Sequence, residues 1–490
     1  MVFLWMGHKS HSKKNLIQKD RLIMSRNETI KRTIILLWSL LGVAILTAMY
    51  MWVWTQVYHG QYVFNVKLYF RGHVLMAAVY VVLLFFFTST FGGLKIGYLK
   101  PMDVFFSQVF AIIIVDVISY TQISLMEVRL VYSPPMVTLG IAQIVFAGIW
   151  VFLGNKAYRI MFPPRKLLLI YGDHPVDDIL RKFEGRKDKY QIAKLMYMGE
   201  DQDKLYEEMV SKDYRGVVLW DVPAALRNKY LKYMYARNVR VYMMPKISDV
   251  IIKGSDPMHL FDTPIFLTRE YSIKVEQIFL KRCIDIIFGL LLAIITSPIM
   301  LITAICVWAY DRGPILYKQT RCTIGGKEFK IMKFRSMRVD AEKDGVARLA
   351  TKNDDRITPI GRFIRAVRID ELPQLFNILK GDMSFIGPRP ERPEIIEQYM
   401  EDMPEFAFRM KVKAGLAGYA QVYGKYNTTP YDKLKLDLSY IENYSIWLDL
   451  KLMMLTLKIL FSPDATEGVE SNQTTAAKNI DNVTEDGKLQ

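Results

Sequence analysis

Residues 365–390 read RAVRIDELPQLFNILKGDMSFIGPRP and contain an adjacent acidic pair, Asp370 and Glu371. Basic residues surround this pair, and the last of them stands between two prolines: Arg365, Arg368 and Pro388-Arg389-Pro390. Mg²⁺ uses one or two carboxylates and completes its shell with phosphate oxygens of a substrate. The planar guanidinium of an arginine with a restricted backbone suits bidentate phosphate binding. We therefore expect Asp370 and Glu371 to bind Mg²⁺ and the proline-flanked arginine to bind phosphate.

A simpler interpretation of the same stretch is an amphipathic helix with solvated charges. Its buried face would consist of Leu372, Leu375, Phe376 and Ile378. The acidic pair taken alone favours this interpretation, so the decision depends on the motifs that precede it. A second acidic pair, Asp340 and Glu342, is a weaker metal candidate because it lies in a polar segment.

Composition narrows the class of protein. The chain has 490 residues, 51% of them hydrophobic, and a net charge of +16. This length predicts two to four domains, and the basic excess suits nucleic acid, an anionic membrane face or phosphorylated substrates. We expect no nucleic acid, because neither a zinc-ligand spacing nor an RNA-binding signature occurs. Three cysteines in no paired spacing, Cys283, Cys306 and Cys322, indicate reduced thiols in a cytosol-facing protein.

An α-helical membrane bundle of four spans is expected within residues 33–155. Each apolar run is near the roughly 20 residues that cross a bilayer, and the runs lie at about 33–54, 73–91, 103–125 and 136–153. Lys and Arg gather before the first run and after the second and fourth, which predicts that both ends of the bundle are cytoplasmic. Residues 1–32 are therefore a basic cytoplasmic flank, with Met24 as an alternative start. Asp116 in the third run serves helix packing or an intramembrane function.

Residues 165–270 alternate short β-like and helical stretches, which predicts a doubly wound α/β domain with a parallel sheet. Strands are expected at 167–171, 192–198, 216–220 and 239–244, with helices near 175–185, 201–212 and 223–236. The first turn has Gly172 where a dinucleotide site needs three glycines, so a structural or regulatory role is favoured over nucleotide binding. His174 and Asp221 follow predicted strands and receive no assigned role.

The fifth apolar run, residues 284–308 within 275–312, has Ser297-Pro298 near its centre. Proline removes a helical hydrogen bond and clashes with the preceding turn, so a break is expected there. Basic residues flank the run at both ends: Lys281, Arg282, Arg312 and Lys318. This distribution favours a re-entrant membrane hairpin that enters and leaves on the cytoplasmic side, with Asp285 spaced to pair with Lys281. The alternative is a fifth span kinked at proline.

A series of motifs follows this run and leads into the acidic pair. They lie at 313–321 (GPILYKQTR), 325–327 (GGK), 329–337 (FKIMKFRSM) and 353–358 (NDDRIT). In this order, together with the acidic pair, they resemble the bacterial sugar transferase family of monotopic polyprenyl-phosphate hexose-1-phosphate transferases. The resemblance covers about 275–462. The preceding bundle and α/β domain resemble the long form of this family, found in exopolysaccharide and capsule initiators.

The resemblance implies an α/β catalytic domain at 313–462 that faces the cytoplasm at the bacterial inner membrane. It implies transfer of a hexose 1-phosphate, with glucose or galactose favoured, from a UDP-sugar to undecaprenyl phosphate with release of UMP. It implies Asp370 as the nucleophile, Glu371 as its Mg²⁺-associated partner and Arg389 as a phosphate ligand. Three more basic residues are candidate phosphate or substrate contacts, although a solvated position is the alternative for the first two: Lys333, Arg335 and Arg365.

The C-terminal part adds three expectations. Residues 415–422 (GLAGYAQV) resemble the family's glycine-rich segment, with departures at Lys413-Ala414, Ala417 and Tyr419. Residues 446–461 interleave apolar residues with lysines, as an interfacial helix or a core helix does. Residues 463–490 are polar and acidic, which predicts a disordered tail.

The four-helix bundle also offers a surface for a homodimer.

Two functions from other classes stay open at this point. One is a membrane scaffold or nucleotide sensor in which the α/β domain is the working part. The other is an ordinary glycosyltransferase, which would release UDP instead of UMP. The leaving nucleotide discriminates between the two kinds of transferase.

Overall fold

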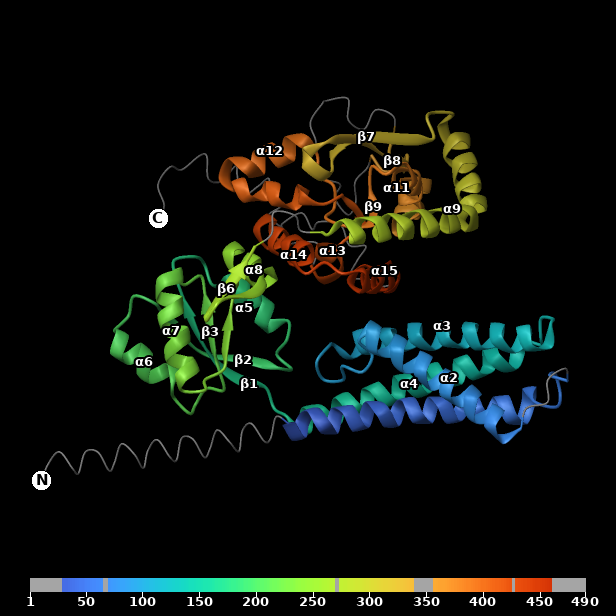
Figure 1. Cartoon of the computed structure of the whole chain (residues 1–490), viewed down its shortest axis with the longest axis horizontal. Helices are drawn as coiled ribbons and strands as arrows, with labels where there is room; N and C mark the ends of the chain where they lie inside the picture. Colours follow the sequence, from blue (N-terminus) through green and yellow to red (C-terminus); the bar gives the residue numbers. More distant parts are fainter. Residues whose placement is uncertain (1–28, 65–68, 269–272, 339–355, 425–427, 461–490) are drawn as a thin grey trace, which may run out of the picture. The chain divides into compact units, whose positions relative to one another are not determined.

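The computed structural model describes residues 29–64, 69–268, 273–338, 356–424 and 428–460. The chain forms two compact units, residues 1–244 and residues 245–490 (Figure 1). Several expectations lie outside the described residues: the N-terminal flank up to residue 28 with Met24, the motif residues 353–355, the acidic residues Asp340 and Glu342, and the tail at 463–490.

Four long apolar helices form the first part of the first unit. They are Thr29–Tyr58, whose last turn is the π-helix η1 (Trp54–Tyr58), then α2 (Phe70–Phe91), α3 (Pro101–Glu127) and α4 (Pro134–Met161). Each is long and apolar enough to cross a membrane, and each covers one of the four expected runs. Proline in the first turn favours the starts of α3 and α4, because the missing amide is unpaired there in any helix.

Asp116 of α3 lies inside this bundle, with 6% of its surface exposed. The hydroxyl of Tyr80 on α2 donates to Oδ1 of Asp116 at 2.9 Å. Nε2 of Gln143 on α4 donates to the Tyr80 hydroxyl at 2.9 Å and to the carbonyl of Leu46 at 3.0 Å. These polar contacts join all four helices, which favours the helix-packing interpretation of Asp116.

A four-stranded parallel sheet with the order β2-β1-β3-β4 follows the bundle. Its strands are β1 (Arg165–Tyr171), β2 (Tyr190–Tyr197), β3 (Val217–Trp220) and β4 (Val241–Met243). Its helices are α5 (Asp177–Glu184), α6 (Gln202–Met209) and α7 (Ala224–Ala236). The expected α/β domain with a parallel sheet is therefore confirmed.

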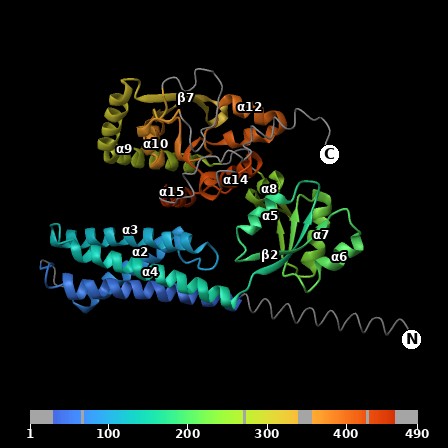
Figure 2. The same cartoon turned by 180° about the vertical axis from the view of Figure 1, so that it is seen from behind.

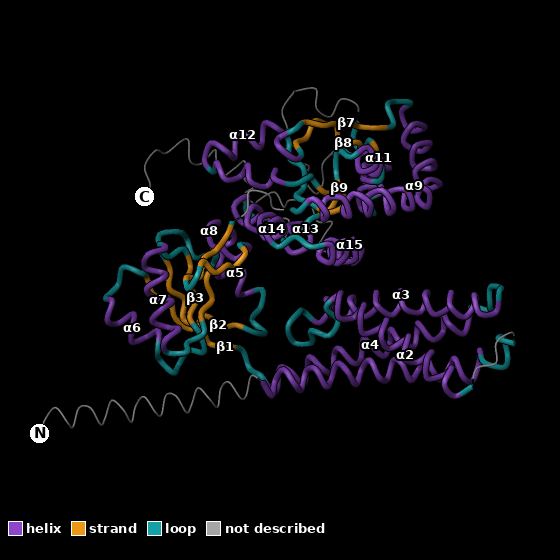
Figure 3. Tube along the Cα trace, in the orientation of Figure 1, coloured by secondary structure: helices purple, strands orange, loops and turns teal. Residues whose placement is uncertain are grey.

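The two faces of this sheet are covered by different helices, as Figures 2 and 3 show. On one face, Leu168 and Ile170 of β1 pack in a core with residues of α6 and α7. On the other face, Leu167 and Leu169 pack with residues of α5. Successive strand residues point to opposite faces, so a run of four buried residues requires helices on both sides.

The second unit contains the fifth apolar helix, α9 (Val275–Asp311). Figure 1 shows α9 turning sharply part-way along its length, and Pro298 lies inside it. The helix is therefore bent and contains the proline at which we expected a break, and the Ser297 hydroxyl donates to the carbonyl of Ile294 at 2.8 Å. Lys281, Asp285 and Gly289 recur every four residues and are buried. One face of the first arm thus packs on the unit, and most of its other side chains are exposed and apolar.

Most of the remaining elements of the second unit follow α9 in the chain. The helices are α10 (Pro359–Ala366), α11 (Gln374–Lys380), α12 (Pro393–Asp402), α13 (Tyr419–Tyr423), α14 (Pro430–Glu442), α15 (Ile446–Leu460) and the 3₁₀ turns η2 (Ile324–Gly326), η3 (Ile369–Glu371) and η4 (Pro404–Lys411). The strands β7 (Leu316–Cys322) and β8 (Glu328–Phe334) pair antiparallel, and β9 (Ser384–Ile386) and β10 (Gly415–Ala417) pair parallel.

Residues 245–268, expected within the α/β domain, belong to the second unit. They form α8 (Ile247–Gly254) and the hairpin of β5 (Asp256–Leu260) and β6 (Thr263–Leu267). Val250 of α8 shares a buried core with Leu434 and Ile441 of α14. Gly254 lies so close to Glu442 that a side chain there would collide with it. Packing against α14 thus sets this boundary.

The last helix, α15, has one buried face and one exposed apolar face. Asp449 and Leu452 are buried, whereas Trp447 and Leu457 are 70% and 52% exposed. One face therefore belongs to the core, and the apolar residues on the other face are available to a membrane interface.

Candidate active site

The acidic pair lies on a short turn of its own, η3, between α10 and α11. Arg368 precedes it with φ +54°, a left-handed conformation that ends α10 and redirects the chain. The amphipathic helix α11 begins only at Gln374, with Leu375 and Ile378 in its buried face. The two interpretations of this stretch therefore apply to different parts of it, and the acidic pair is separate from the helix.

Glu371 is held by cations from three elements. Nζ of Lys333 on β8 donates to its Oε1 at 3.1 Å, and the Arg389 guanidinium donates to the same oxygen at 3.0 Å. Arg368 lies 3.6 Å from Oε2. Burial acts to raise the pKa of Glu371, but Lys333 and Arg389 outweigh it and hold the pKa well below its usual range. Glu371 is therefore a carboxylate at any physiological pH.

Asp370 differs from its neighbour, although both are carboxylates in a buried turn. It is 8% exposed, and within the ranges that the structure describes no hydrogen bond reaches its carboxylate. Burial raises its pKa to about 6, and repulsion from Glu371 adds to this rise. The cations Lys333, Arg365 and Arg368 act in the opposite direction. Asp370 is thus a free, unusually basic carboxylate at neutral pH.

The proline-flanked arginine is fixed by its main chain. The carbonyl of Pro388 accepts from the amide of Gly415 at 2.9 Å, and the carbonyl of Arg389 accepts from Arg409 at 2.9 Å. Arg321 donates to the carbonyl of Pro390 at 3.4 Å. Pro388 and Pro390 are buried, while the Arg389 side chain is 37% exposed. Only the guanidinium is thus left to meet a ligand.

Five of the basic and proline positions predicted from the sequence come together at this place: Lys333, Arg365, Pro388, Arg389 and Pro390. Arg335 does not join them. Its guanidinium forms a two-pronged ion pair with Asp311 at the end of α9, with Nη1 of Arg335 at 2.7 Å from Oδ2 of Asp311. Arg335 is 8% exposed and follows β8 directly, so the buried ion pair with Asp311 holds its guanidinium away from the acidic pair.

A match to the family model described as "Bacterial sugar transferase" covers residues 276–463. The chain is 33% identical over 297 residues to a UDP-N-acetylgalactosamine-undecaprenyl-phosphate N-acetylgalactosaminephosphotransferase of Aeromonas hydrophila, covering 57% of this chain and 69% of that protein. It is 36% identical to a UDP-glucose:undecaprenyl-phosphate glucose-1-phosphate transferase of Klebsiella pneumoniae, covering 52% and 54%. It is 35% identical to an undecaprenyl-phosphate galactose phosphotransferase of Salmonella typhimurium, covering 46% and 50%.

This chain belongs to the bacterial sugar transferase family. The expected family is thereby confirmed, and so is the expected type of enzyme, a sugar-phosphate transferase. The chain spans about half the length of the Klebsiella and Salmonella relatives. The match includes α9 from its second residue onward and every residue of the acidic and basic cluster.

Sequence reasoning missed the buried ion pairs that support the transferase's arginine segment. Arg409 binds Asp437 at 2.8 Å, and these side chains are 3% and 1% exposed. Glu391, next to the segment, pairs with Arg409 at 3.6 Å and also with Lys433. Burial acts to raise the pKa of Glu391, but Lys433 and Arg409 outweigh it and lower the pKa to about 2. The sequence signal was weak, because these residues lie far apart along the chain.

The transferase also departs from the expected pairing at the start of α9. Lys281 forms its ion pair with Asp449 at 2.6 Å and not with Asp285. Asp285 instead accepts hydrogen bonds from the Ser384 hydroxyl and the Phe385 amide. Lys281 and Asp285 are buried against other elements of the unit. Each therefore binds a partner on those elements, and the ion pair predicted within α9 does not form.

A metal ion at this site would depend on the acidic pair. The described residues contain no group of three or more His, Cys, Asp or Glu side chains placed to hold one. Asp370 and Glu371 together match the coordination preference of Mg²⁺, which binds one or two protein carboxylates and completes its coordination shell with phosphate and water oxygens. The carboxylate of Asp370, which accepts no hydrogen bond from the described residues, is available for such a contact.

The α/β domain of the transferase holds a separate polar cluster at the carboxyl ends of its strands. His174 contacts Asp221 through Nδ1, and the Tyr197 hydroxyl donates to Asp173 at 2.7 Å. Gly172 presses so closely on the main chain of Asp221 that a side chain there would collide with it. No role is assigned to this edge, and the favoured structural or regulatory role stays a prediction.

Proposed function

We propose that this chain transfers a hexose 1-phosphate from a UDP-sugar to undecaprenyl phosphate and releases UMP. The observation that carries the proposal is the contrast within the acidic pair. Glu371 is occupied by three cations, whereas Asp370 is buried, basic and free of hydrogen bonds from the described residues. A carboxylate without hydrogen bonds from the described residues, next to several basic side chains, suits covalent catalysis on a phosphate ester.

In the first step, an oxygen of Asp370 attacks the phosphorus that carries the sugar. The new bond is an acyl phosphate, and the bond broken is the one to UMP, which leaves with its electron pair. In the second step, a phosphate oxygen of undecaprenyl phosphate attacks the same phosphorus and expels the Asp370 carboxylate. One carboxylate thus lets a soluble donor and a lipid acceptor use the site in turn.

The cations around the pair offset the like charges that this chemistry brings together. A carboxylate that approaches a diphosphate meets repulsion, and fixed cations in a partly buried site reduce that barrier. Arg389 offers a planar fork for a phosphate, and Lys333 and Arg365 add positive charge beside Asp370. At neutral pH most of Asp370 remains ionised, and its raised pKa makes it a stronger base than an ordinary carboxylate.

We further propose Mg²⁺ as the cofactor, held by Asp370 and Glu371 together with substrate oxygens. When bound, the ion neutralises charge on the diphosphate and on the departing UMP. The protein's share is to keep Glu371 ionised and Arg389 aligned, as the contacts to Lys333 and Arg409 do.

The membrane arrangement belongs to the same proposal. The exposed apolar side chains of α9 suit a helix in lipid, and the bend at Pro298 supports a re-entrant path with both ends at the cytoplasmic face. The second unit would then lie in the cytoplasm at the inner membrane, where UDP-sugars and the lipid phosphate meet. The four-helix bundle would anchor the chain and offer a homodimer surface.

The decisive experiment follows the leaving nucleotide. Purified protein is incubated with undecaprenyl phosphate, Mg²⁺ and a panel of UDP-sugars, because the relatives act on N-acetylgalactosamine, glucose and galactose substrates. Glucose and galactose are the donors that we expect to work. UMP release that requires the lipid for sustained turnover and is lost in Asp370→Asn supports the proposal. UDP release would show an ordinary glycosyltransferase, and no release across the panel would favour a scaffold or sensor.

A further inference from the structure

The strand β9 leads directly into the arginine that binds Glu371. Ser384, Phe385 and Ile386 form the strand, and Arg389 follows three residues after its end. Its neighbour β10 pairs with it through only two partner positions, so the backbone ladder is short. The main-chain bonds of Pro388, Arg389 and Pro390 fix the segment after the strand, and contacts to β9 itself help to hold Arg389 at 3.0 Å from Glu371.

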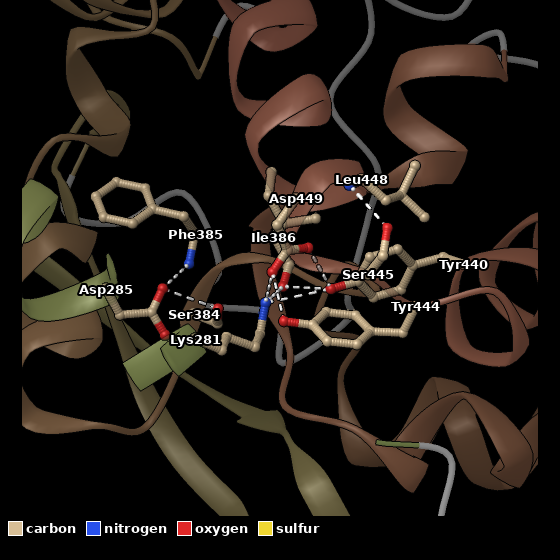
Figure 4. Close-up of polar contacts among 10 residues, drawn as sticks. All are labelled: Lys281, Asp285, Ser384, Phe385, Ile386, Tyr440, Tyr444, Ser445, Leu448 and Asp449. Atoms are coloured by element: carbon tan, nitrogen blue, oxygen red, sulfur yellow. Dashed lines mark hydrogen bonds and ion pairs between the residues drawn. The ribbon is translucent and has the colours of Figure 1, made fainter. Parts of the chain in front are cut away.

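Those contacts come from the first arm of the membrane helix α9, as Figure 4 shows. The Asp285 carboxylate accepts from the Ser384 hydroxyl at 2.9 Å and from the Phe385 amide at 3.0 Å. Nζ of Lys281 donates to the carbonyl of Ile386 at 2.8 Å. Two residues one helical turn apart on α9 therefore bind all three residues of β9.

Lys281 is in turn held by the last two helices of the chain. Asp449 of α15 accepts from Lys281 at 2.6 Å, and Tyr440 of α14 lies 3.2 Å from the same Nζ. The Tyr440 hydroxyl donates to Asp449 at 2.7 Å, and the Tyr444 hydroxyl donates to it at 3.3 Å. The network joins α9, β9, α14 and α15 around one buried ammonium group (Figure 4).

Stability alone does not explain a buried network of charged side chains, because removing them from water costs free energy. Lys281 is 8% exposed and Asp285 is 3% exposed, and charges taken out of water cost free energy that pairing offsets only when the geometry is good. Apolar side chains of similar size at these positions would pack α9 against the core without that cost. What they could not provide is a set of directed bonds to the main chain of β9.

We infer that Lys281 and Asp285 are positioning residues for the transfer reaction. They act through β9, which they hold so that Arg389 meets Glu371 and a substrate phosphate in one geometry. The membrane helix and the phosphate-binding arginine thus form one rigid element. This inference rests on the proposed function, since it assigns the consequence of the network to phosphate binding by Arg389.

A double-mutant cycle tests the inference. Asp285→Ala leaves the Phe385 amide without its partner, and we expect kcat/KM for the UDP-sugar to fall about 10- to 100-fold, the scale of a small misplacement of a binding group. Asp285→Asn keeps an acceptor oxygen for that amide and should restore most of the activity. Glu276→Ala, at an exposed position in the first turn of the same helix, is the matched control and should leave kcat/KM unchanged.

The decisive arm combines Asp285→Ala with Arg389→Gln, using radiolabelled donor so that low turnover remains measurable. If Asp285 acts by placing Arg389, its loss has no further effect once the guanidinium is gone, and the two losses are far from additive. An equal loss from Asp285→Ala in both backgrounds would overturn the inference, because a general effect on folding does not depend on Arg389. Unchanged kcat/KM in Asp285→Ala alone would overturn it too. Wild-type protein that releases no UMP would instead reject the proposed function.

Discussion

The guanidinium of Arg389 donates to Oε1 of Glu371 at 3.0 Å. The same oxygen accepts from Lys333, so the arginine is aligned by a carboxylate that cannot be protonated near neutral pH. Arg389 is therefore oriented before any substrate arrives, and 37% of its side chain stays exposed.

Arg389→Lys is expected to lower kcat/KM by at least about tenfold, because lysine keeps the charge but loses the planar fork that matches phosphate. Steady-state UMP release at varied UDP-sugar measures this effect. Arg362→Lys, at an exposed position on α10, is the control and should behave as the wild type. Equal activity of Arg389→Lys and the wild type would mean that Arg389 supplies charge alone.

The pH dependence of kcat/KM should report Asp370. Its pKa is raised to about 6, and the attacking form is the carboxylate, so activity should rise through pH 6 and level off above it. Arg365 lowers this pKa, so Arg365→Gln should shift the midpoint to higher pH. A midpoint near pH 4 in the wild type would contradict a buried nucleophile, and a midpoint that does not move in the variant would contradict the role of Arg365.

Glu391 should contribute to stability at neutral pH. Its folded-state pKa is about 2, below the unfolded value of 4.5, so its contribution is complete above about pH 4.5 and is lost as the pH falls towards 2. Glu391→Gln should cost up to about 3 kcal/mol at pH 7, and the cost should shrink at pH 3.5. Thermal unfolding at both pH values measures the difference. Glu394→Gln, at an exposed position on α12, should change stability little at either pH, and a pH-independent loss in Glu391→Gln would exclude the electrostatic explanation.

The bend in α9 should set the side of the membrane on which the chain continues. In a protein without its native cysteines, Lys318→Cys should react with a membrane-impermeant maleimide only after the cells are permeabilised. Pro298→Leu should straighten the helix and expose the same cysteine to the reagent in intact cells, because the straight helix is long enough to cross. Labelling in intact cells while Pro298 is present would establish a fifth span instead.

Local patterns predicted much of this fold. The four apolar runs became four long helices, and the alternation at 165–244 became the parallel sheet with its helices, because run length and periodicity are visible along the sequence. Lys333 and Arg389, which the order of motifs marked as candidate phosphate or substrate contacts, both bind Glu371 in the structure, and their roles stay predictions.

Partners chosen by tertiary packing could not be predicted in this way. The spacing of Lys281 and Asp285 favoured an ion pair within the helix, but Lys281 binds Asp449, which lies 168 residues away. Arg335 was expected to contact phosphate or substrate together with Lys333, but its guanidinium pairs with Asp311 at the end of α9. The difference between Asp370 and its neighbour Glu371 comes from burial and from cations on other elements, which adjacency along the chain does not reveal.

The packing of α8 on α14 determines where a domain boundary can be placed when a chimeric protein is made from this chain. Val250 fills the same core as Leu434 and Ile441, so a chimera joined at residue 245 would carry the transferase unit with its hydrophobic interior complete. A junction at residue 273, just before the membrane helix, would bring an apolar face of α14 into water. The segment that can be exchanged as a complete folded unit is thus longer than the segment that matches the family model.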